Sequence, residues 1–350
     1  EMCIRDRVWV GRDRIGGEAM TDIPRLSIII EWSNALLTEA ERPARMMEAL
    51  AEQAAALDSG NDSAGENGRF PIEVLVCFDG SSVDSESITR MAPLASPGLK
   101  GSIPVRHCNF PGAEYYDLKN LGAERASGES FLFLDSDVVP QDGWLESLWN
   151  TFREEEFAVV AGVSFIDPVN LYASATALNW VFGLSPDWLE TRPAKHFWAN
   201  NVCFRREVFK THPFPAMNGS SRGACQALAN TLVARGIPLN VNGSARVTHP
   251  APAGLGGFFE RAMAQGRDRV LWHRGAGSWW MQSLPASFLR YLKNLARVVG
   301  RSTTHYRDVG LRLWQVPAVM VISGGYYTVF LVGEVLTHLA PAYMKRSFRV

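Results

Sequence analysis

The sequence predicts an α/β protein built on a mostly parallel sheet that is flanked by helices. The first observation is a series of short, almost continuously apolar segments that alternate with segments of helical periodicity. Strands that are apolar along their whole length are usually covered on both faces, as in parallel sheets. The second observation is that acidic residues close or follow three of these segments, at Glu31, Asp79 and Asp135. Because ligands bind beyond the carboxyl ends of parallel strands, this pattern also predicts a binding site.

Five strands follow one another in the first half of the chain. We expect them at Leu26–Ile30, Glu73–Phe78, Val105–Cys108, Ser130–Leu134 and Val159–Phe165. We expect helices from Thr38 to about Leu57, near Ser85–Met91, at Tyr115–Ala126, and from Asp142 or Gly143 to about Glu155. Thr38 and Glu41 have the spacing of a capping box at the first of these helices. Residues 58–70 are rich in Gly, Asn, Asp and Ser, so they are expected to form a loop.

The composition argues against several classes of protein. The chain has 350 residues, of which 47% are hydrophobic, so it can bury a sizeable core. Its 35 basic and 36 acidic residues give a net charge of −1, which gives no indication of nucleic-acid binding. No two of the five cysteines have CxxC spacing. Neither a zinc site nor a disulfide framework is therefore predicted, and a reducing compartment is favoured.

Four segments are expected along the chain. Residues 1–19 lack both a lasting periodicity and the apolar core of a signal peptide, so we interpret them as a non-native leader that ends before Met20. Residues 20–255 are expected to form the α/β domain. Residues 256–312 would form a basic helical connector, and residues 313–350 an apolar tail that is a candidate for membrane insertion.

An Asp-Ser-Asp sequence follows the fourth predicted strand. In extended geometry residues i and i+2 point to the same side, so Asp135 and Asp137 can approach one site at the edge of the sheet. Mg²⁺ and Mn²⁺ favour oxygen ligands such as carboxylates and substrate phosphates. The sequence therefore predicts a divalent-metal site for a ligand that carries a diphosphate.

Three stretches of the chain together resemble family 2 glycosyltransferases. They are LSIIIEWSNA, EVLVCFDGSSVDSES and DLKNLGAERASGESFLFLDSDVVPQDGWLE, and the resemblance covers about residues 24–250. The family shows a first strand ending in a Pro-x-x-Asn turn, an Asp-Gly-Ser stretch, an Arg-Asn or Lys-Asn helix and an Asp-x-Asp strand. The resemblance implies a GT-A fold, a nucleotide-sugar donor, Mg²⁺ or Mn²⁺ as cofactor, and inversion at the anomeric carbon.

The resemblance also implies roles for residues that would bind the donor. Asp79 would hydrogen bond to the base, and the backbone around Glu31 and Ser33 would line the base and the ribose. Lys119 would lie near the diphosphate, where a cation is useful. Glu31 stands where the family usually has proline, so its own role is left open.

Three residues are expected at the metal. By resemblance, Asp135 would face the ribose or the metal, and Asp137 would bind the metal directly. His249 ends the last predicted strand, and in several GT-A enzymes a late histidine completes the metal site. Imidazole is an acceptable ligand for Mn²⁺. The alternative for His249 is a hydrogen-bonded loop histidine without a ligand.

The general base of the family is missing from its expected place. Family members commonly carry a Glu-Asp or Asp-Asp pair at the start of a helix that here corresponds to Gly223–Arg235. This chain has Cys225 and Gln226 there, and neither side chain is a carboxylate base. Asp187 or Glu190 could serve instead. Alternatively, the acceptor is anionic and needs no base, or the chain binds nucleotide-sugar without turning it over.

The acceptor site is predicted from two features of the second half. Trp198, Asn200 and Asn201 are expected to line the acceptor or sugar pocket, with a plain core position as the alternative. Arg222 or Arg235 would suit an anionic acceptor such as a lipid phosphate. The acceptor is accordingly expected to be lipid-linked, a polysaccharide, or another hydroxyl or phosphate group.

A basic helix is expected at the start of the C-terminal third. Residues 289–312 contain six Lys or Arg residues against one Asp, which gives six minus one, or +5. Spacings of three and four residues put the first four cations on one stripe of a helix, and apolar residues supply another side. The stripe consists of Arg290, Lys293, Arg297 and Arg301. Such a helix is drawn to an anionic membrane, or it is a solvated surface helix.

Residues 313–333 follow as 21 residues without a charge, long enough to cross a bilayer core. Pro317 and the pair Gly324 and Gly325 weaken a simple span, so an interfacial hairpin or a buried helix of a soluble fold are alternatives. Because basic segments stay inside, we expect the protein on the cytoplasmic face of a membrane, either peripheral or with one C-terminal membrane segment.

The leading hypothesis is therefore a metal-dependent inverting glycosyltransferase. The alternative is a catalytically degenerate nucleotide-sugar-binding protein of the same fold. A nucleotidyltransferase would normally have a Gly-rich, basic loop after the first strand, and the sequence Glu-Trp-Ser-Asn at that place does not fit this class.

Overall fold

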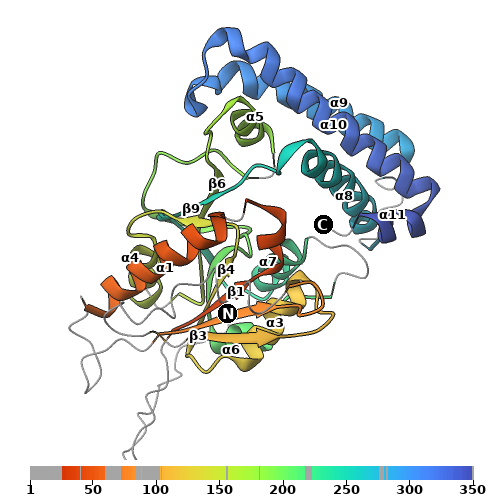
Figure 1. The fold of residues 1–350 in the computed structure, drawn as a ribbon. Helices are drawn as coiled ribbons and strands as arrows, with labels where there is room; N and C mark the ends of the chain where they lie inside the picture. Colours follow the sequence, from red (N-terminus) through yellow and green to blue (C-terminus); the bar gives the residue numbers. More distant parts are fainter. Residues whose placement is uncertain are drawn as a thin grey trace, which may run out of the picture.

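The computed structural model describes residues 26–39, 41–59, 72–83, 88, 103, 105–154, 157–180, 182–216, 223–275, 280 and 283–348. The expected leader at residues 1–19 lies outside these ranges. So do most of the loop expected at residues 58–70 and, apart from Ile88, the helix expected near Ser85–Met91. In the described part, one nine-stranded sheet runs through the molecule with helices on both faces (Figure 1).

The first half of the sheet is entirely parallel. In spatial order it consists of β3 (Val105–Asn109), β2 (Ile72–Phe78), β1 (Leu26–Glu31) and β4 (Ser130–Asp135). These positions confirm the four predicted strands to within one residue at each end. Every residue of β1, β2 and β4 is buried, which is why their sequences show no polar alternation.

The second half of the sheet has mixed directions. Its strands are β8 (Asn201–Arg205), β6 (Val159–Ile166), β9 (Leu239–His249), β5 (Val139–Pro140) and β7 (Thr191–Ala194). β8 is antiparallel to β4 and β6, whereas β6 and β9 are parallel. β5 begins two residues after Asp137 and pairs with Val247 and Thr248. The sheet thereby brings the end of β9 next to the Asp-Ser-Asp segment.

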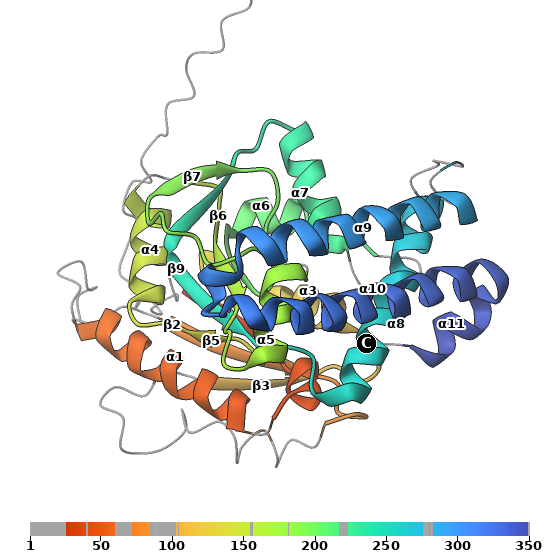
Figure 2. The same cartoon turned by 90° about the horizontal axis from the view of Figure 1, so that it is seen from above.

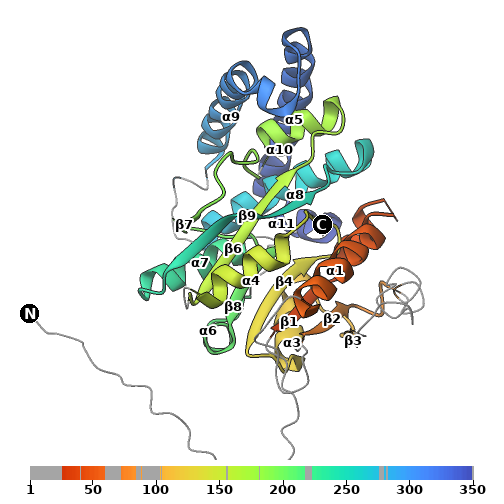
Figure 3. The same ribbon diagram turned by 90° about the vertical axis from the view of Figure 1, so that its left-hand side faces the viewer.

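Each face of the sheet has its own helices and its own core (Figure 3). Ile28 and Ile30 of β1 belong to the core beneath α1 (Glu41–Ser59) and α4 (Trp144–Glu154). Ile29 points to the other face, as the two-residue repeat of a strand requires. That face is covered by α3 (Tyr115–Arg125), α6 (Arg206–Thr211) and α7 (Ala224–Ala234).

The first helix begins later than predicted. A short 3-10 helix, η1 (Ser33–Leu37), follows β1 directly, and Thr38 is extended. α1 begins at Glu41, so the predicted start at Thr38 is wrong by three residues. Pro43 lies in the first turn of α1, where proline is tolerated because those N–H groups have no partner within the helix.

The C-terminal helices and α5 form a layer at one end of the sheet (Figures 1 and 2). This layer contains α5 (Leu171–Asn179), α8 (Gly254–Gly275), α9 (Leu284–Thr304), α10 (Val316–Leu339) and α11 (Pro341–Ser347). A Cβ atom on Gly266 of α8 would lie 2.2 Å from the Phe330 carbonyl oxygen of α10. One on Gly333 would lie 2.5 Å from the Met263 carbonyl oxygen. Glycine at these two positions therefore allows the backbones of α8 and α10 to approach closely. The expected connector (residues 256–312) and the expected tail (residues 313–350) thus pack against each other.

The basic stripe of α9 is shared between solvent and the helix packed against it. Lys293 and Arg297 are exposed, as expected, whereas Arg290 and Arg301 are half-buried. Arg290 Nε donates to Glu334 Oε1 at 2.9 Å, and this glutamate of α10 is buried. Arg297 donates to the hydroxyl of Tyr327, also on α10. The helical repeat correctly groups the cations on one stripe, but only the packed α10 decides which side of α9 is covered.

Candidate functional site

The carboxyl ends of the parallel strands carry the acidic residues that the sequence singles out. Glu31 ends β1 and Asp135 ends β4, and the two are direct partners in the register of the sheet. Asp79 follows β2, whose Cys77 is paired with Glu31 on the other side. The structure thus brings these three residues to one edge of the sheet.

Three protein groups hydrogen bond to the Asp135 carboxylate. Its Oδ1 accepts a hydrogen bond from Lys119 Nζ at 2.6 Å, and its Oδ2 accepts one from Asn34 Nδ2 at 3.1 Å. The Tyr115 hydroxyl lies 2.9 Å from both oxygens. Lys119 is completely buried, so this ion pair lies in the interior beneath the edge of the sheet. Asp135 is consequently fixed in position, and its charge is balanced by Lys119.

Two of these partners have no role in the sequence prediction. Asn34 is the asparagine of the turn after the first strand, so the resemblance contained a signal for it. Tyr115 begins the helix that carries Lys119, and nothing in the sequence indicates that it reaches Asp135.

Asp137 and His249 face each other. His249 Nε2 lies 3.3 Å from Asp137 Oδ2, and both side chains are almost fully buried. On the other side of the ring, His249 Nδ1 lies 2.7 Å from the Pro250 carbonyl oxygen. A carbonyl only accepts, so Nδ1 carries a proton toward Pro250, and Nε2 is the ring atom that faces the Asp137 carboxylate.

Arg42 explains how these two residues come together. Its guanidinium donates to the backbone oxygen of Asp137 and, at 2.8 Å, to the carbonyl oxygen of Thr248. It therefore ties the Asp-Ser-Asp segment to the end of β9. Trp180 and Phe182 pack against the ring of His249, with centroid distances of 5.7 and 4.8 Å. Sequence reasoning missed Arg42, whose position in α1 carries no local signal.

The pair formed by Asp137 and His249 fits a divalent cation. An imidazole nitrogen and a carboxylate oxygen that face each other can hold either a proton or a metal ion between them. A ligating histidine typically donates its other N–H to a carbonyl or carboxylate, as Nδ1 does here. Within the described residues, no group of three or more His, Cys, Asp or Glu side chains could hold a metal. Such an ion would need further oxygen ligands from a bound diphosphate.

Glu31 is engaged with Ser33 rather than exposed to a ligand. Its Oε1 accepts hydrogen bonds from both the backbone N–H and the hydroxyl of Ser33. Burial, followed by the nearby charge of Asp135, raises the pKa of Glu31 to about 8. The side chain is therefore mostly protonated at neutral pH, and a neutral group can be buried beside Asp135 where a second carboxylate would be repelled.

Asp79 organises the turn between β2 and the segment that follows it. Its carboxylate accepts hydrogen bonds from the Ser81 hydroxyl at 2.7 Å and from the Gly112 N–H at 2.9 Å. Hydrogen bonds from Ser81, followed by that from Gly112, hold the pKa of Asp79 well below its usual range. Asp79 thus stays ionised at the edge of the sheet, where it is half-buried, and it links two loops.

The three residues expected in the acceptor pocket have different surroundings. Trp198 is partly buried and packs on Phe182, which in turn contacts His249. The Asn200 side chain accepts a hydrogen bond from the Ser164 hydroxyl at 2.8 Å. Asn201 is completely buried, and its amide bonds to the Trp144 indole and to the Ala245 carbonyl oxygen. Asn201 therefore connects strands inside the sheet and presents no group to a pocket.

The candidate bases lie away from these residues. Asp187 is exposed, and Glu190 is exposed and paired with Arg192. The backbone of Glu190 bonds to Gly243, six positions before His249 on β9. α7 has no acidic residue in its first turn, where the thiol of Cys225 instead accepts from the Tyr116 hydroxyl at 3.6 Å.

Of the two arginines suggested for an anionic acceptor, only Arg235 lies within the described residues. Arg235 caps the far end of α7, on the order of 15 Å from the start of an 11-residue helix. Arg222 lies outside the described residues.

Comparisons with known proteins concern the family and the fold of the chain. Residues 44–213 match the model of the family described as glycosyl transferase family 2. No curated protein matches the chain. A solved structure of a mannosyltransferase from Pyrobaculum calidifontis, in complex with GDP-Man and Mn²⁺, is similar at 16% identity and a TM-score of 0.49. The likeness covers 92% of this chain and 88% of that one. With the family match and the sheet topology, the predicted GT-A type α/β fold is confirmed.

Proposed function

Since residues 44–213 match the model of glycosyl transferase family 2, we propose that the chain transfers a sugar, with inversion, from a nucleotide-sugar donor to an acceptor in a metal-dependent reaction. One observation supports this most directly. His249 Nε2 faces the Asp137 carboxylate at 3.3 Å, at the edge of the sheet where the diphosphate of a donor would lie.

The residues at the edge of the sheet divide into those that would hold the metal and those that would hold the donor. Asp137 and His249 would be the protein ligands of Mg²⁺ or Mn²⁺. When bound, the ion would stabilise the negative charge that builds on the diphosphate leaving group. Asp135, locked by Lys119 and Tyr115, would present its carboxylate edge to the ribose.

The base and the ribose would occupy the space between Asp79 and η1. Asp79 is half-buried and ionised, so it can accept a hydrogen bond from the edge of a base. The side chains of Glu31 and Ser33 already bond to each other. The ribose would therefore be supported by the backbone between the end of β1 and the start of η1. Trp198 and Asn200 remain the proposed residues of the acceptor pocket.

One observation favours a second candidate, a protein that binds nucleotide-sugar without transferring it. The first turn of α7 contains no acidic residue, although family members commonly place the general base there. An anionic acceptor would remove the need for this base. The two candidates differ in turnover and agree in donor binding, so binding and turnover must be measured separately.

Donor binding is expected to depend on both the nucleotide and the metal. We expect one class among UDP-, GDP-, CDP- and dTDP-sugars to raise the unfolding midpoint in the presence of Mn²⁺ and to have little effect without it. A ligand at a hundred times its Kd adds about 2.7 kcal/mol of stability, which is about 2–4 °C for a domain of this size. Release of free sugar or formation of a glycosylated product then separates transfer from mere binding. If no nucleotide-sugar shifts the midpoint in either condition, the proposed function is wrong.

The C-terminal layer also supports a proposal about location. α10, together with the preceding turn, is long and apolar enough to cross a membrane, but it is packed against α8 and α9. Its outer side carries exposed Val321 and Val332, and α9 beside it exposes Phe288 and Leu292. We propose that these two outer sides lie flat on the cytoplasmic face of an anionic membrane.

The exposed sides of α9 and α10 meet at a polar contact. The Tyr291 hydroxyl of α9 lies 3.1 Å from Thr328 Oγ1 of α10, which joins the two exposed sides. Trp314, at the start of α10, is 72% exposed, and tryptophan is enriched at membrane interfaces. Residues 284–348 contain eight Lys or Arg residues and two acidic ones, a balance of +6 that suits anionic lipid.

A charge on this face is expected to release the protein from vesicles. In flotation with vesicles that contain anionic lipid, the double variant Phe288→Glu and Val321→Glu should bind about tenfold more weakly than the wild type. Val233→Glu on α7, at a position that is 49% exposed, is the matched control and should float like the wild type. Point variants are preferable to truncation near Pro285, because α9 and α10 supply part of a buried core. Equal flotation of all three proteins would contradict the membrane proposal.

A further inference from the structure

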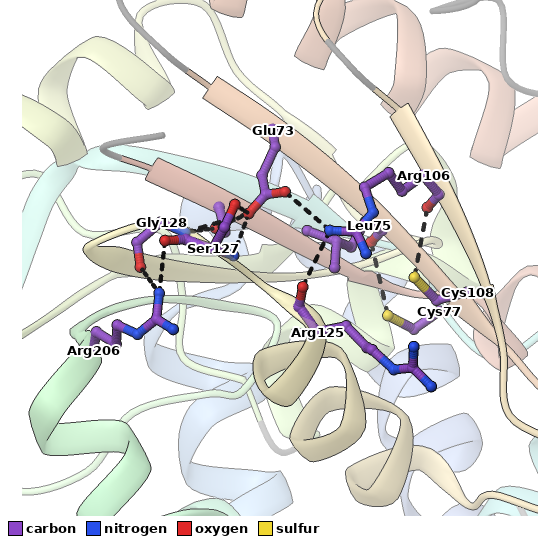
Figure 4. A network of polar contacts seen from close by, with 10 residues as sticks. Glu73, Leu75, Cys77, Arg106, Cys108, Arg125, Ser127, Gly128 and Arg206 are labelled. Carbon is purple, nitrogen blue, oxygen red and sulfur yellow. Dashed lines mark hydrogen bonds and ion pairs between the residues drawn. The ribbon is translucent and has the colours of Figure 1, made fainter. Parts of the chain in front are cut away.

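Two cysteines lie side by side on neighbouring strands at the edge of the sheet. Cys77 of β2 and Cys108 of β3 are direct partners in the parallel register. Both side chains belong to the core on the same face of the sheet, and each sulfur approaches the carbonyl oxygen two residues before it (Figure 4). Partner Cα atoms on neighbouring strands are about 4.8 Å apart, within the range of about 4.4–6.8 Å that a disulfide needs.

The two thiols differ in access and in acidity. Cys77 is completely buried, whereas Cys108 is partly exposed on the outer strand. The hydrogen bond from Cys77, followed by the charges of Arg106 and Arg125, lowers the pKa of Cys108 to about 7. A thiolate is the reactive form of cysteine, so Cys108 would meet an oxidant first.

The surroundings leave room for the sulfur of Cys77. A Cβ atom on Gly122 of α3 would lie 2.7 Å from Cys77 Sγ, so the glycine is what allows the thiol to sit under the helix. β3 lies at the outer edge of the sheet and pairs only with β2 among the described strands. It can therefore shift toward β2 more easily than an inner strand could.

We propose that Cys108 and Cys77 form a reversible thiol-modification site, in which Cys108 is the entry thiol and Cys77 the resolving thiol of an intramolecular disulfide. Cys203 and Cys225 are the other cysteines in the described part of the chain. Both are buried on other elements, and neither has a cysteine partner in the sheet register.

The reaction with a small disulfide such as oxidised glutathione can be written in balanced steps. The Cys108 thiolate attacks one sulfur of the oxidant, forms a mixed disulfide and releases one glutathione thiolate. Cys77 loses its proton to that thiolate and attacks Cys108 Sγ, which displaces the second glutathione. In sum, two protein thiols are oxidised and one glutathione disulfide is reduced to two thiols.

The position of the pair suggests what the disulfide would control. Asp79 lies two residues after Cys77, and its carboxylate accepts a hydrogen bond from the Gly112 N–H. Asn109 directly follows Cys108, and its side chain accepts a hydrogen bond from the Gly80 N–H at 2.8 Å. Drawing β3 toward β2 would shift these contacts. This consequence rests on the proposed function, since it assumes that Asp79 binds the donor.

Thiol counting and peptide mapping test the modification itself. After treatment of the full chain with oxidised glutathione, we expect a mass lower by two hydrogen atoms and a peptide that joins Cys77 to Cys108. Cys77→Ser should stop at the mixed disulfide and gain one glutathione on Cys108. Cys108→Ser should leave Cys77 unmodified, because Cys77 is buried. A wild-type protein that keeps glutathione on Cys108, or that leaves Cys108 unmodified, overturns the proposal.

Donor affinity tests the consequence separately. The oxidised wild type is expected to bind its nucleotide-sugar about tenfold more weakly than the reduced protein, and reduction should restore the affinity. Unchanged affinity would overturn control of the Asp79 turn. If even the reduced protein binds no nucleotide-sugar, the proposed function fails, whereas the mapped disulfide is unaffected by that result.

Discussion

Replacing Asp137 with alanine is expected to lower the rate of sugar transfer by about 10²–10³-fold, the usual loss when one group that stabilises transition-state charge is removed. Asp137 supplies one of the two protein ligands in the proposed metal site, and its partner His249 lies only 3.3 Å away. The nucleotide-sugar should still contact Asp135 and Asp79. The affinity of the variant for nucleotide-sugar should therefore fall only to the value that the wild type shows without Mn²⁺. Calorimetry with and without Mn²⁺ and a transfer assay measure both effects.

Asp142→Ala is the matched control for this variant. Asp142 is an exposed aspartate five residues further along the same segment, and its removal should change neither affinity nor rate. Circular dichroism must show that the Asp137 variant is folded. Wild-type turnover by the folded variant in Mn²⁺ would refute the assignment of Asp137.

Replacing Lys119 with methionine is expected to destabilise the protein by about 3–5 kcal/mol, the usual cost of removing one partner of a buried ion pair. Lys119 is fully buried, and its Nζ lies 2.6 Å from Asp135 Oδ1. Methionine has a similar length but no charge, so Asp135 would be left with hydrogen bonds from neutral groups only. Urea denaturation gives the change in the free energy of unfolding.

Two further variants separate the ion pair from simple packing. The double variant Lys119→Met and Asp135→Asn removes both charges and should recover part of the lost stability, because no buried charge is left unbalanced. Arg125→Met removes an exposed cation from the same helix and should change stability by no more than about 0.5 kcal/mol. If Lys119→Met costs as little as Arg125→Met, Lys119 does not balance Asp135 in the folded protein.

The parallel half of the sheet could be predicted closely because its signals are local. Strands such as Leu26–Glu31 are buried on both faces, so their sequences are apolar throughout and are bounded by polar turns. The ends of helices were harder to predict. The spacing of Thr38 and Glu41 suggests a cap, yet η1 occupies the preceding residues and moves the helix start to Glu41.

The sequence by itself determined the edge of the sheet that carries Glu31, Asp79 and Asp135, because parallel strands place their carboxyl ends together. Only the tertiary structure decided which partners complete the site. Arg42 and Thr248 are 206 residues apart, and their contact depends on how β9 pairs with β5. Likewise, the spacing of cations on α9 is local, but the side that faces inward is set by Glu334 and Tyr327 of α10. A helical or strand repeat determines which residues share a face, and long-range packing determines what that face contacts.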